Sequence, residues 1–314
     1  MLRLALIGCG GHSSRNHAPA LQLYAEEHPG DVKLAAVCDL DLDRANQSCE
    51  RFGFACAYGN VDEMLAAEQL DGCLCVMGVA DIVTMAIGLL ERGMPCTIEK
   101  PPGSTLADVA RLRACARETG TPHQISVNRR FMTHLNRGLQ WARERGEIRM
   151  VSGSILRHQR MEPEFVWSTS IHVVDTVRYI GGDVAEDESF VIEAPELSCR
   201  WYEFSLGFTN GGRGHIRLVP TAGINDEVYE FAGENFRVLV NDEGVRGWAD
   251  GELMLDEPIA EAPNCVTSGA YGELSEFVAA LREGRAPKPG IEDVYDSARI
   301  CFEAARAAGV INED

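Results

Sequence analysis

Lysine is scarce in this 314-residue sequence. Of its 29 lysine and arginine residues, only Lys33, Lys100 and Lys288 are lysines. Arginine keeps its proton in proteins, whereas the pKa of a lysine can be lowered until the amine acts as an acid or a base. Lys100, which stands beside the carboxylate Glu99, is therefore a candidate for chemistry that arginine cannot perform, the alternative being an exposed lysine without a role.

Positive charge and long apolar runs are scarce as well. The net charge of -19 argues against binding to nucleic acids or anionic membranes, because their phosphates would repel the chain. No apolar run reaches the roughly eighteen residues that cross a bilayer, and no signal-peptide pattern opens the sequence. We therefore expect a cytoplasmic protein with neither a nucleic-acid nor a membrane partner.

The eleven cysteines show neither the spacing of metal ligands nor the density of a small disulfide-linked protein. Several of them, Cys38, Cys73, Cys75 and Cys96, stand inside apolar runs. These positions are typical of reduced residues in a core. We expect no disulfide framework and no metal site.

The length favours two domains, and the pattern of elements changes near residue 125. Before that point, short apolar strands alternate with helices, as in Leu2–Ile7, Val32–Cys38, 71–77 and Cys96–Ile98. This alternation predicts a doubly wound parallel sheet. Residues 126–314 instead predict an α+β domain with an open, mostly antiparallel sheet, whose last helix packs back on the first domain.

A glycine-rich loop follows the first strand and precedes a helix. Gly8 and Gly10 fit the turn that lets a pyrophosphate approach the backbone, and Ser13 occupies the third glycine position of the fingerprint. Asp39 ends the second strand, where a carboxylate accepts hydrogen bonds from a ribose and repels a 2′-phosphate. This context predicts binding of NAD rather than NADP, the alternative being an ordinary strand-to-helix turn.

Lys100 stands at the end of a strand, next to Glu99. Pro101 and Pro102 follow it, and a proline forces its predecessor away from helical geometry. The carboxyl end of a strand in an open α/β sheet is where ligands bind. Lys100 is therefore predicted to face the ligand.

A helix expected at residues 170–180 carries His172 and Asp175 in its first turns. Residues three apart share a helix face, so Asp175 is placed to orient the imidazole. Two interpretations stay open: a catalytic histidine, or a histidine at the edge of the core whose partner is a capping serine. The glycine loop and Lys100 favour the first.

In combination, these residues resemble the Gfo/Idh/MocA oxidoreductases, which include glucose–fructose oxidoreductase and inositol dehydrogenase. The resemblance spans essentially the whole chain and rests on motifs in a fixed order: Ile7-Gly8-Cys9-Gly10-Gly11 with His17 and Pro19, Glu99-Lys100-Pro101, Asn128-Arg129-Arg130-Phe131, the helix with His172, Tyr271-Gly272-Glu273-Leu274 with Phe277, and Ile291-Glu292-Asp293. Each motif alone is weak, but their order is specific.

The resemblance implies a Rossmann domain at residues 1–125 that binds NAD(P) and a second domain at residues 126–314 for substrate and oligomerisation. It implies acid/base roles for Lys100 and His172 and places Glu99 against the cofactor. The cofactor-binding candidates are Gly8, Gly10, Gly11, His12, Asp39, Glu99 and Lys100. Relatives of this kind assemble through the exposed face of the second sheet, so we expect a homodimer or homotetramer.

Two departures from the family pattern bear on the chemistry. Ser168 stands where many members carry an aspartate on the face of the histidine, and Met77–Ile82 replaces the usual threonine-proline segment. Glu162 or Glu164 is a candidate for the missing carboxylate. The substrate-lining candidates are Arg130, Arg157, His158, Ser168 and Asp175.

We therefore expect an NAD-dependent oxidoreductase that acts on a secondary hydroxyl or keto carbon of a carbohydrate-like small molecule. In alcohol oxidation His172 would be the general base, while Lys100 stabilises the charge on the same oxygen. Two alternatives stay open: a keto or imine reductase or a tightly-bound-cofactor redox enzyme of the same family, and a non-catalytic NAD(P)-binding regulatory protein.

Overall fold

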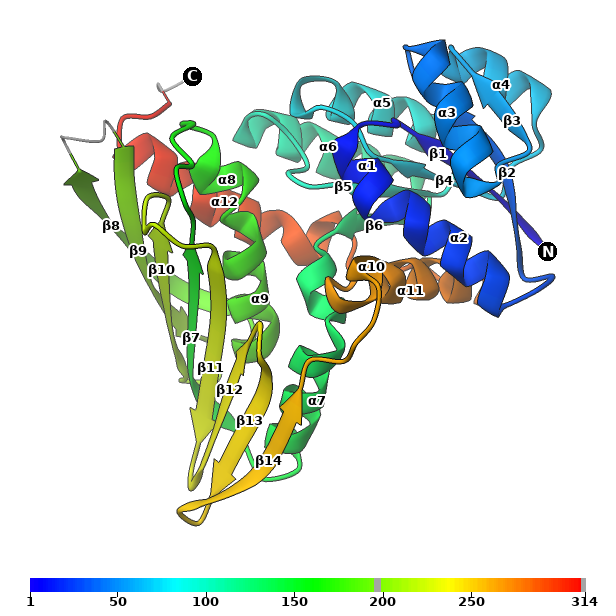
Figure 1. The fold of residues 1–314 in the computed structure, drawn as a ribbon. Helices are drawn as coiled ribbons and strands as arrows, with labels where there is room; N and C mark the ends of the chain where they lie inside the picture. The colour runs from blue at the N-terminus through cyan, green and yellow to red at the C-terminus, as the bar shows by residue number, and fades with distance from the viewer. Residues whose placement is uncertain (195–198, 312–314) are drawn as a thin grey trace. The chain divides into compact units, whose positions relative to one another are not determined.

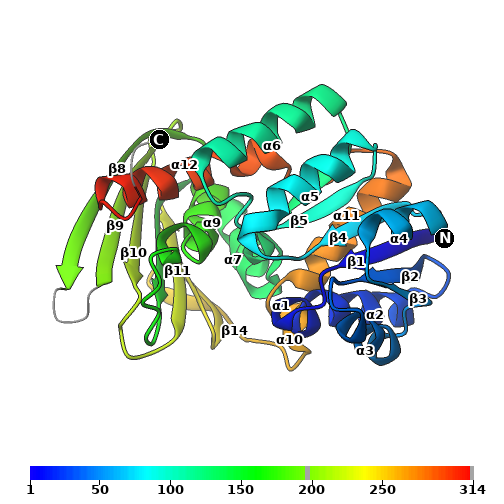
Figure 2. The same cartoon turned by 90° about the horizontal axis from the view of Figure 1, so that it is seen from above.

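The computed structural model describes residues 1–194 and 199–311, which form two compact units (Figures 1 and 2). Unit 1 comprises Met1–Phe131 and Ala262–Tyr295, and unit 2 comprises Met132–Glu261 and the chain from Asp296 onward. The division of roles expected between residues 1–125 and 126–314 stays a prediction.

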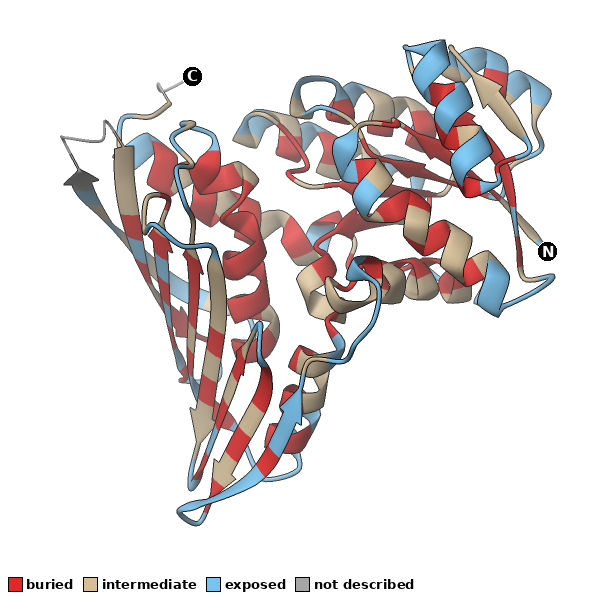
Figure 3. Ribbon diagram, viewed as in Figure 1, coloured by how far each residue is buried: buried red, intermediate tan, exposed pale blue. Residues whose placement is uncertain are grey.

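Unit 1 is built on a six-stranded parallel sheet of order β3-β2-β1-β4-β5-β6. The order reverses between β1 and β4, which is the switch point where open α/β sheets bind ligands. The inner strands are buried (Figure 3). The bounds are β1 Leu2–Ile7, β2 Val32–Cys38, β3 Cys56–Tyr58, β4 Gly72–Cys75, β5 Cys96–Glu99 and β6 His123–Ser126.

Helices cover both faces of this sheet (Figure 2). On one face α2 packs with α11 over β1 and β2, in a core that includes Leu21, Leu274 and Phe277. On the other face α5 and α6 pack together. The helical segments are α1 Gly11–Arg15, α2 His17–Glu27, α3 Leu42–Phe52, α4 Val61–Ala67, α5 Val79–Glu91, α6 Leu106–Thr119, η1 Asn128–Phe131, α10 Asn264–Thr267, α11 Ala270–Glu283 and the start of α12, Ile291–Ala307. The doubly wound parallel sheet is confirmed.

Unit 2 is built on an eight-stranded sheet of order β14-β13-β12-β11-β7-β10-β9-β8. All neighbouring strands pair antiparallel except β7 and β10, which pair parallel. The mostly antiparallel open sheet is confirmed. The bounds are β7 Ile148–Leu156, β8 Val184–Ala194, β9 Cys199–Phe208, β10 Arg213–Val219, β11 Asp226–Gly233, β12 Phe236–Asn241, β13 Gly244–Ala249 and β14 Glu252–Pro258.

The helices of unit 2 pack against one face of its sheet. Helix α9 (Ile171–Gly181) lies over β7 and β10, and α7 (Thr133–Arg143) lies over β12 and β13. A Cβ at Gly153 of β7 would lie 2.6 Å from Val173 of α9, so the glycine permits this close approach. Strand β10 alternates buried and exposed residues, as a strand with one covered face should.

Among the described residues, no helix combines the length and the apolar character needed to span a membrane.

Candidate functional site

A cavity of about 1090 Å³ opens in unit 1 at the carboxyl ends of β1, β2, β4 and β5. The glycine loop after β1, Asp39 after β2, Met77 after β4, and Glu99 with Lys100 at the end of β5 all line it. All seven predicted cofactor-binding residues therefore line one cavity. The sheet brings them together because parallel strands end at the same edge.

The glycine loop lies closely against the neighbouring strand. Gly8 has φ of +93°, and a Cβ there would lie 1.9 Å from the carbonyl oxygen of Val76. Only glycine fits this position, since a side chain would clash with backbone. Gly10 precedes α1, and apart from its chain neighbours no atom of the described residues lies within 4 Å of where its Cβ would be. That open space is what a phosphate group needs to reach the backbone N–H groups.

Asp39 connects the end of β2 to the glycine loop through a hydrogen bond. Its Oδ2 accepts a hydrogen bond from the Cys9 backbone N–H at 2.7 Å, and its Oδ1 accepts one from the Asp41 backbone N–H at 2.9 Å. Arg44 approaches Oδ1 at 3.5 Å and pairs with Asp41 at 3.3 Å. A carboxylate oxygen has two acceptor sites, so Asp39 keeps capacity for a further donor such as a ribose hydroxyl.

Arg44 lines the cavity with its side chain half exposed, and the sequence analysis did not select it. Its position, five residues after Asp39 in the first turn of α3, is the signal that would have found it. An arginine near this carboxylate is the group that accommodates a 2′-phosphate in NADP-binding relatives of this fold. Here its contacts are with Asp39 and Asp41.

Glu99, the last residue of β5, lies between two histidines. The Nε2 of His17 lies 2.8 Å from Oε2 of Glu99, and the Nε2 of His12 lies 3.4 Å from Oε1. Burial alone would raise the pKa of Glu99, but the hydrogen bonds and charges of His12 and His17 hold it well below its usual value. Glu99 is therefore an ionised carboxylate within a buried cluster. From sequence, His17 was identified only as part of a motif. Its contact with Glu99 was not predicted, because the two residues are 82 positions apart.

Lys100 follows Glu99 and is half-buried in the wall of the same cavity. The predicted position at a strand end is confirmed, since β5 ends one residue earlier.

The histidine candidate belongs to unit 2. Helix α9 buries His172 and Asp175, which are 5% and 1% exposed. Oδ1 of Asp175 accepts a hydrogen bond from the Ser297 hydroxyl of α12 at 2.9 Å, and that hydroxyl accepts one from Arg178 at 2.6 Å. Ser297 thus links the buried carboxylate of Asp175 to the buried guanidinium of Arg178. It was not predicted from sequence, because α12 is far from α9 along the chain.

Ser168 and His172 lie in two successive helical segments. Ser168 ends α8 (Phe165–Ser168), and α9 begins at Ile171. The backbone N–H groups of Thr169 and Ser170 both donate to the Phe165 carbonyl, at the point where α8 ends. The part of Ser168 in the site stays a prediction.

The other substrate candidates carry structural contacts. In unit 2, the Arg157 guanidinium donates to the Leu156 and Asp226 carbonyls at 2.8 and 3.2 Å and pairs with Glu227. His158 is exposed, and its N–H donates to Asn225. In unit 1, Arg130 lies in η1 and donates to the Asp293 carbonyl at 3.4 Å.

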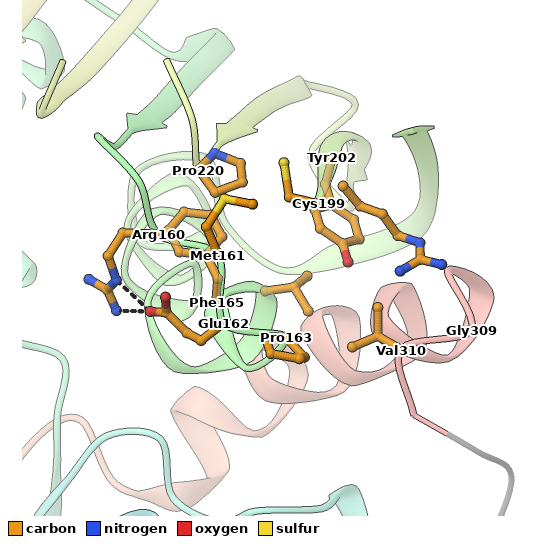
Figure 4. Close-up of a pocket in the computed structure, with 12 residues that line it drawn as sticks. Arg160, Met161, Glu162, Pro163, Phe165, Cys199, Tyr202, Pro220, Gly309 and Val310 are labelled. Carbon is orange, nitrogen blue, oxygen red and sulfur yellow. Dashed lines mark hydrogen bonds and ion pairs between the residues drawn. The ribbon is translucent and has the colours of Figure 1, made fainter. Parts of the chain in front are cut away.

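A second cavity, of about 210 Å³, lies in unit 2 (Figure 4). The view shows Met161, Phe165 and Tyr202 around it, with Arg160 and Glu162 paired at one side. Burial raises the pKa of Tyr202 to about 12. Glu162 and Glu164 are the two candidates for the missing carboxylate. Glu162 forms an ion pair with Arg160, and Glu164 is exposed.

Known proteins resemble the chain at the level of sequence and of fold. Residues 2–127 match the family described as "Oxidoreductase family, NAD-binding Rossmann fold" (GFO_IDH_MocA). D-apiose dehydrogenase of Paraburkholderia graminis is 30% identical over 202 residues, covering 57% of this chain and 50% of that protein. The chain thus aligns with about half the length of that relative.

Two further proteins match over nearly the full length. Inositol 2-dehydrogenase of Corynebacterium glutamicum (strain R) is 22% identical over 334 aligned positions, covering 100% of this chain and 96% of that protein. The structure of levoglucosan dehydrogenase in complex with NADH and L-sorbose superposes with a TM-score of 0.84 at 17% identity, covering 98% of this chain and 96% of that one. Motif order, sheet topology and these similarities agree: residues 2–127 match the Gfo/Idh/MocA oxidoreductase family, and the fold of the whole chain is similar to that of its structural neighbour.

Proposed function

We propose that this protein is an NAD-dependent oxidoreductase that transfers a hydride between nicotinamide and a CH–OH or keto carbon of a sugar, polyol or related derivative. The observation that carries the proposal is the single cavity lined by Gly8, Gly10, Asp39, Glu99 and Lys100. The names of its relatives, which are dehydrogenases of apiose, inositol and levoglucosan, support the substrate class.

The residues of the cavity fit a dinucleotide. Gly8 permits the tight turn against Val76, Gly10 leaves the backbone open to a pyrophosphate, and Asp39 has acceptor capacity for the adenosine ribose. A 2′-phosphate would meet the carboxylates of Asp39 and Asp41, which repel it and already hold Arg44. These contacts favour NAD over NADP. When bound, the nicotinamide ring supplies or accepts the hydride.

The proton that leaves or joins the substrate oxygen is assigned to His172 and Lys100. In alcohol oxidation His172 is the proposed general base, and Lys100 donates a hydrogen bond to the oxygen as negative charge develops on it. Arg130, Arg157, His158, Ser168 and Asp175 are proposed around the substrate. Asp175, held by Ser297, is the best placed to fix the helix that carries His172.

We further propose that the protein forms a homodimer or homotetramer through the open face of the unit 2 sheet. The strand register places several half-exposed apolar residues on that face, among arginine–glutamate pairs: Met150, Phe190, Ile192 and Leu253. Monomers rarely leave such a combination uncovered. Light scattering coupled to gel filtration tests it, and a monomer at micromolar concentration would contradict it.

The first test is a fluorescence titration of the purified protein with NADH and, separately, with NADPH. Energy transfer from tryptophan to nicotinamide reports binding, and micromolar affinity for NADH with much weaker binding of NADPH is expected. Turnover is then measured with NAD and a panel that includes inositol, apiose and levoglucosan. Binding of neither nucleotide, with no cofactor retained through purification, would overturn the proposal in favour of a non-catalytic scaffold.

A further inference from the structure

Two histidines and a glutamate from three separate elements converge at the end of β5. His12 comes from α1, His17 from the start of α2, and Glu99 from the last position of the strand. If each residue supplies one ligand atom, an imidazole nitrogen or a carboxylate oxygen, the three atoms lie within 4.8 Å of one another. Within residues 1–194 and 199–311 this is the one group of three or more histidine, cysteine or acidic side chains so arranged.

We propose that His12, His17 and Glu99 form a binding site for a transition-metal dication of the Zn²⁺ class. Two imidazole nitrogens and one carboxylate are ligands that suit Zn²⁺, Co²⁺ or Ni²⁺, whereas Mg²⁺ and Ca²⁺ take oxygen ligands almost throughout. No metal site was expected from the sequence, because these residues lack the regular spacing of metal ligands: His17 precedes Glu99 by 82 residues, and His12 precedes it by more.

The donor geometry is close to what such an ion needs. Tetrahedral coordination with bonds of about 2.0–2.2 Å places neighbouring donors about 3.3–3.5 Å apart. His12 Nε2 and Glu99 Oε1 already have this separation, at 3.4 Å. His17 Nε2 contacts the other carboxylate oxygen, Oε2, at hydrogen-bond distance, 2.8 Å. The ion therefore needs this pair to open and the carboxylate either to turn or to bind through both oxygens. Metal binding replaces the protons of these contacts, so it releases protons to solution.

Two of the three side chains are buried, and the third is exposed to solvent. His17 and Glu99 are 3% and 7% exposed, whereas His12 is 47% exposed. His12 and Glu99 also line the large cavity, so the ion reaches them from there. Three protein ligands leave a position for water or for an oxygen of a bound molecule, as in catalytic rather than structural zinc sites.

The charge of the cavity also favours a cation. Five acidic side chains line it against three basic ones: Asp39, Asp41, Asp62, Asp81 and Glu99 against Arg44, Arg92 and Lys100. Together with the net charge of -19, this excess raises the local concentration of a dication.

Co²⁺ titration of the chelator-treated full chain tests the site, because Co²⁺ substitutes for Zn²⁺ and absorbs in the visible range. One equivalent should produce d–d bands of a site with nitrogen and oxygen ligands, without the near-ultraviolet charge-transfer band of a thiolate. This spectrum separates the proposed site from the eleven cysteines. Zn²⁺ should then displace Co²⁺ and abolish the bands.

Variants assign the ligands. Loss of a residue that only hydrogen-bonds to a metal ligand weakens metal binding by about 10- to 100-fold. H12Q and E99Q each remove a ligand itself, so their Co²⁺ affinity should fall by at least that factor. H28Q is the matched control, since His28 is exposed and its ring contacts Tyr271 instead. H12Q keeps the test valid if the buried E99Q variant fails to fold, which circular dichroism checks.

Unchanged Co²⁺ affinity in H12Q, a thiolate spectrum, or no saturable binding in the wild-type chain would each overturn the proposal and leave the cluster as hydrogen bonds alone. The metal titration needs no nucleotide, so its outcome is independent of the NADH titration.

Discussion

The two units present their candidate functional residues in opposite ways. In unit 1 the candidates stand at strand ends and in loops and line one large cavity. In unit 2 His172 and Asp175 lie within a helix of which nearly every residue is buried. The first arrangement follows from the topology of a parallel sheet, whereas the second depends on side chains of α12. The comparison predicts that substitutions in unit 1 change ligand contacts, and those in unit 2 act through packing and proton transfer.

The largest effect is expected from H172N. General acid–base catalysis contributes about 10²- to 10⁴-fold to a rate, so kcat should fall by that factor. The affinity for NADH should stay nearly unchanged, since the described cofactor cavity belongs to unit 1. Steady-state kinetics and the fluorescence titration measure both. H28N, at an exposed histidine of unit 1, is the control, and undiminished kcat in H172N would remove the acid/base role.

K100M should lower kcat by about 10²- to 10³-fold, the cost of removing one donor from a developing oxyanion. NADH affinity should change little, because the glycine loop and Asp39 remain. K33M is a matched control in a chain with only three lysines, since Lys33 is exposed on β2. Full activity of K100M would refute the role of Lys100, and a large loss in K33M would show that the substitution acts through stability.

The contrast between the units also explains what could be predicted from sequence. Gly8, Asp39 and Lys100 were found because the ends of parallel strands meet, so linear order fixes their neighbourhood. The contacts of Glu99 with His17 and of Asp175 with Ser297 span 82 and 122 residues, and no periodicity encodes them. The helix that carries His172, by contrast, was expected at residues 170–180 and spans Ile171–Gly181 in the structure, because helical periodicity is local in the sequence.

S297A tests whether the buried contacts of Ser297 with Asp175 and Arg178 stabilise α9. Ser297 is fully buried, and S297A removes one hydrogen bond to Asp175 and one from Arg178. A hydrogen bond to a charged group contributes about 1.5–3 kcal/mol, so S297A should lower the free energy of unfolding by about that amount. Urea unfolding measures it. S275A in α11 is the control, because the half-buried Ser275 hydroxyl donates to the neutral Tyr271 carbonyl and its loss should cost less. Equal losses of unfolding free energy in the two variants would show that the Asp175–Ser297–Arg178 contacts contribute no more than an ordinary hydrogen bond.

The smallest expected effect is a pH-dependent change of stability at Glu292 of unit 1, which is not among the residues that line the large cavity. Hydrogen bonds from Arg113 and then Arg117 lower the pKa of Glu292 to about 2. A carboxyl group whose pKa is lowered by folding stabilises the fold above its unfolded pKa, and this contribution is lost as the pH falls towards the folded value. Glu292 is 44% exposed, so solvent screening limits the contribution to about 0.2–1 kcal/mol.

E292Q should therefore have a lower Tm than the wild type at pH 7, and the difference should shrink between about pH 4.5 and pH 2. Thermal unfolding followed by circular dichroism across this range measures it. E26Q is the matched control, because Glu26 is exposed and forms no ion pair that the described residues show. A Tm difference for E292Q that stays constant down to pH 2 would mean that the amide disturbs the start of α12 sterically. In that case the charge of Glu292 would have no measurable part in holding α12 to α6.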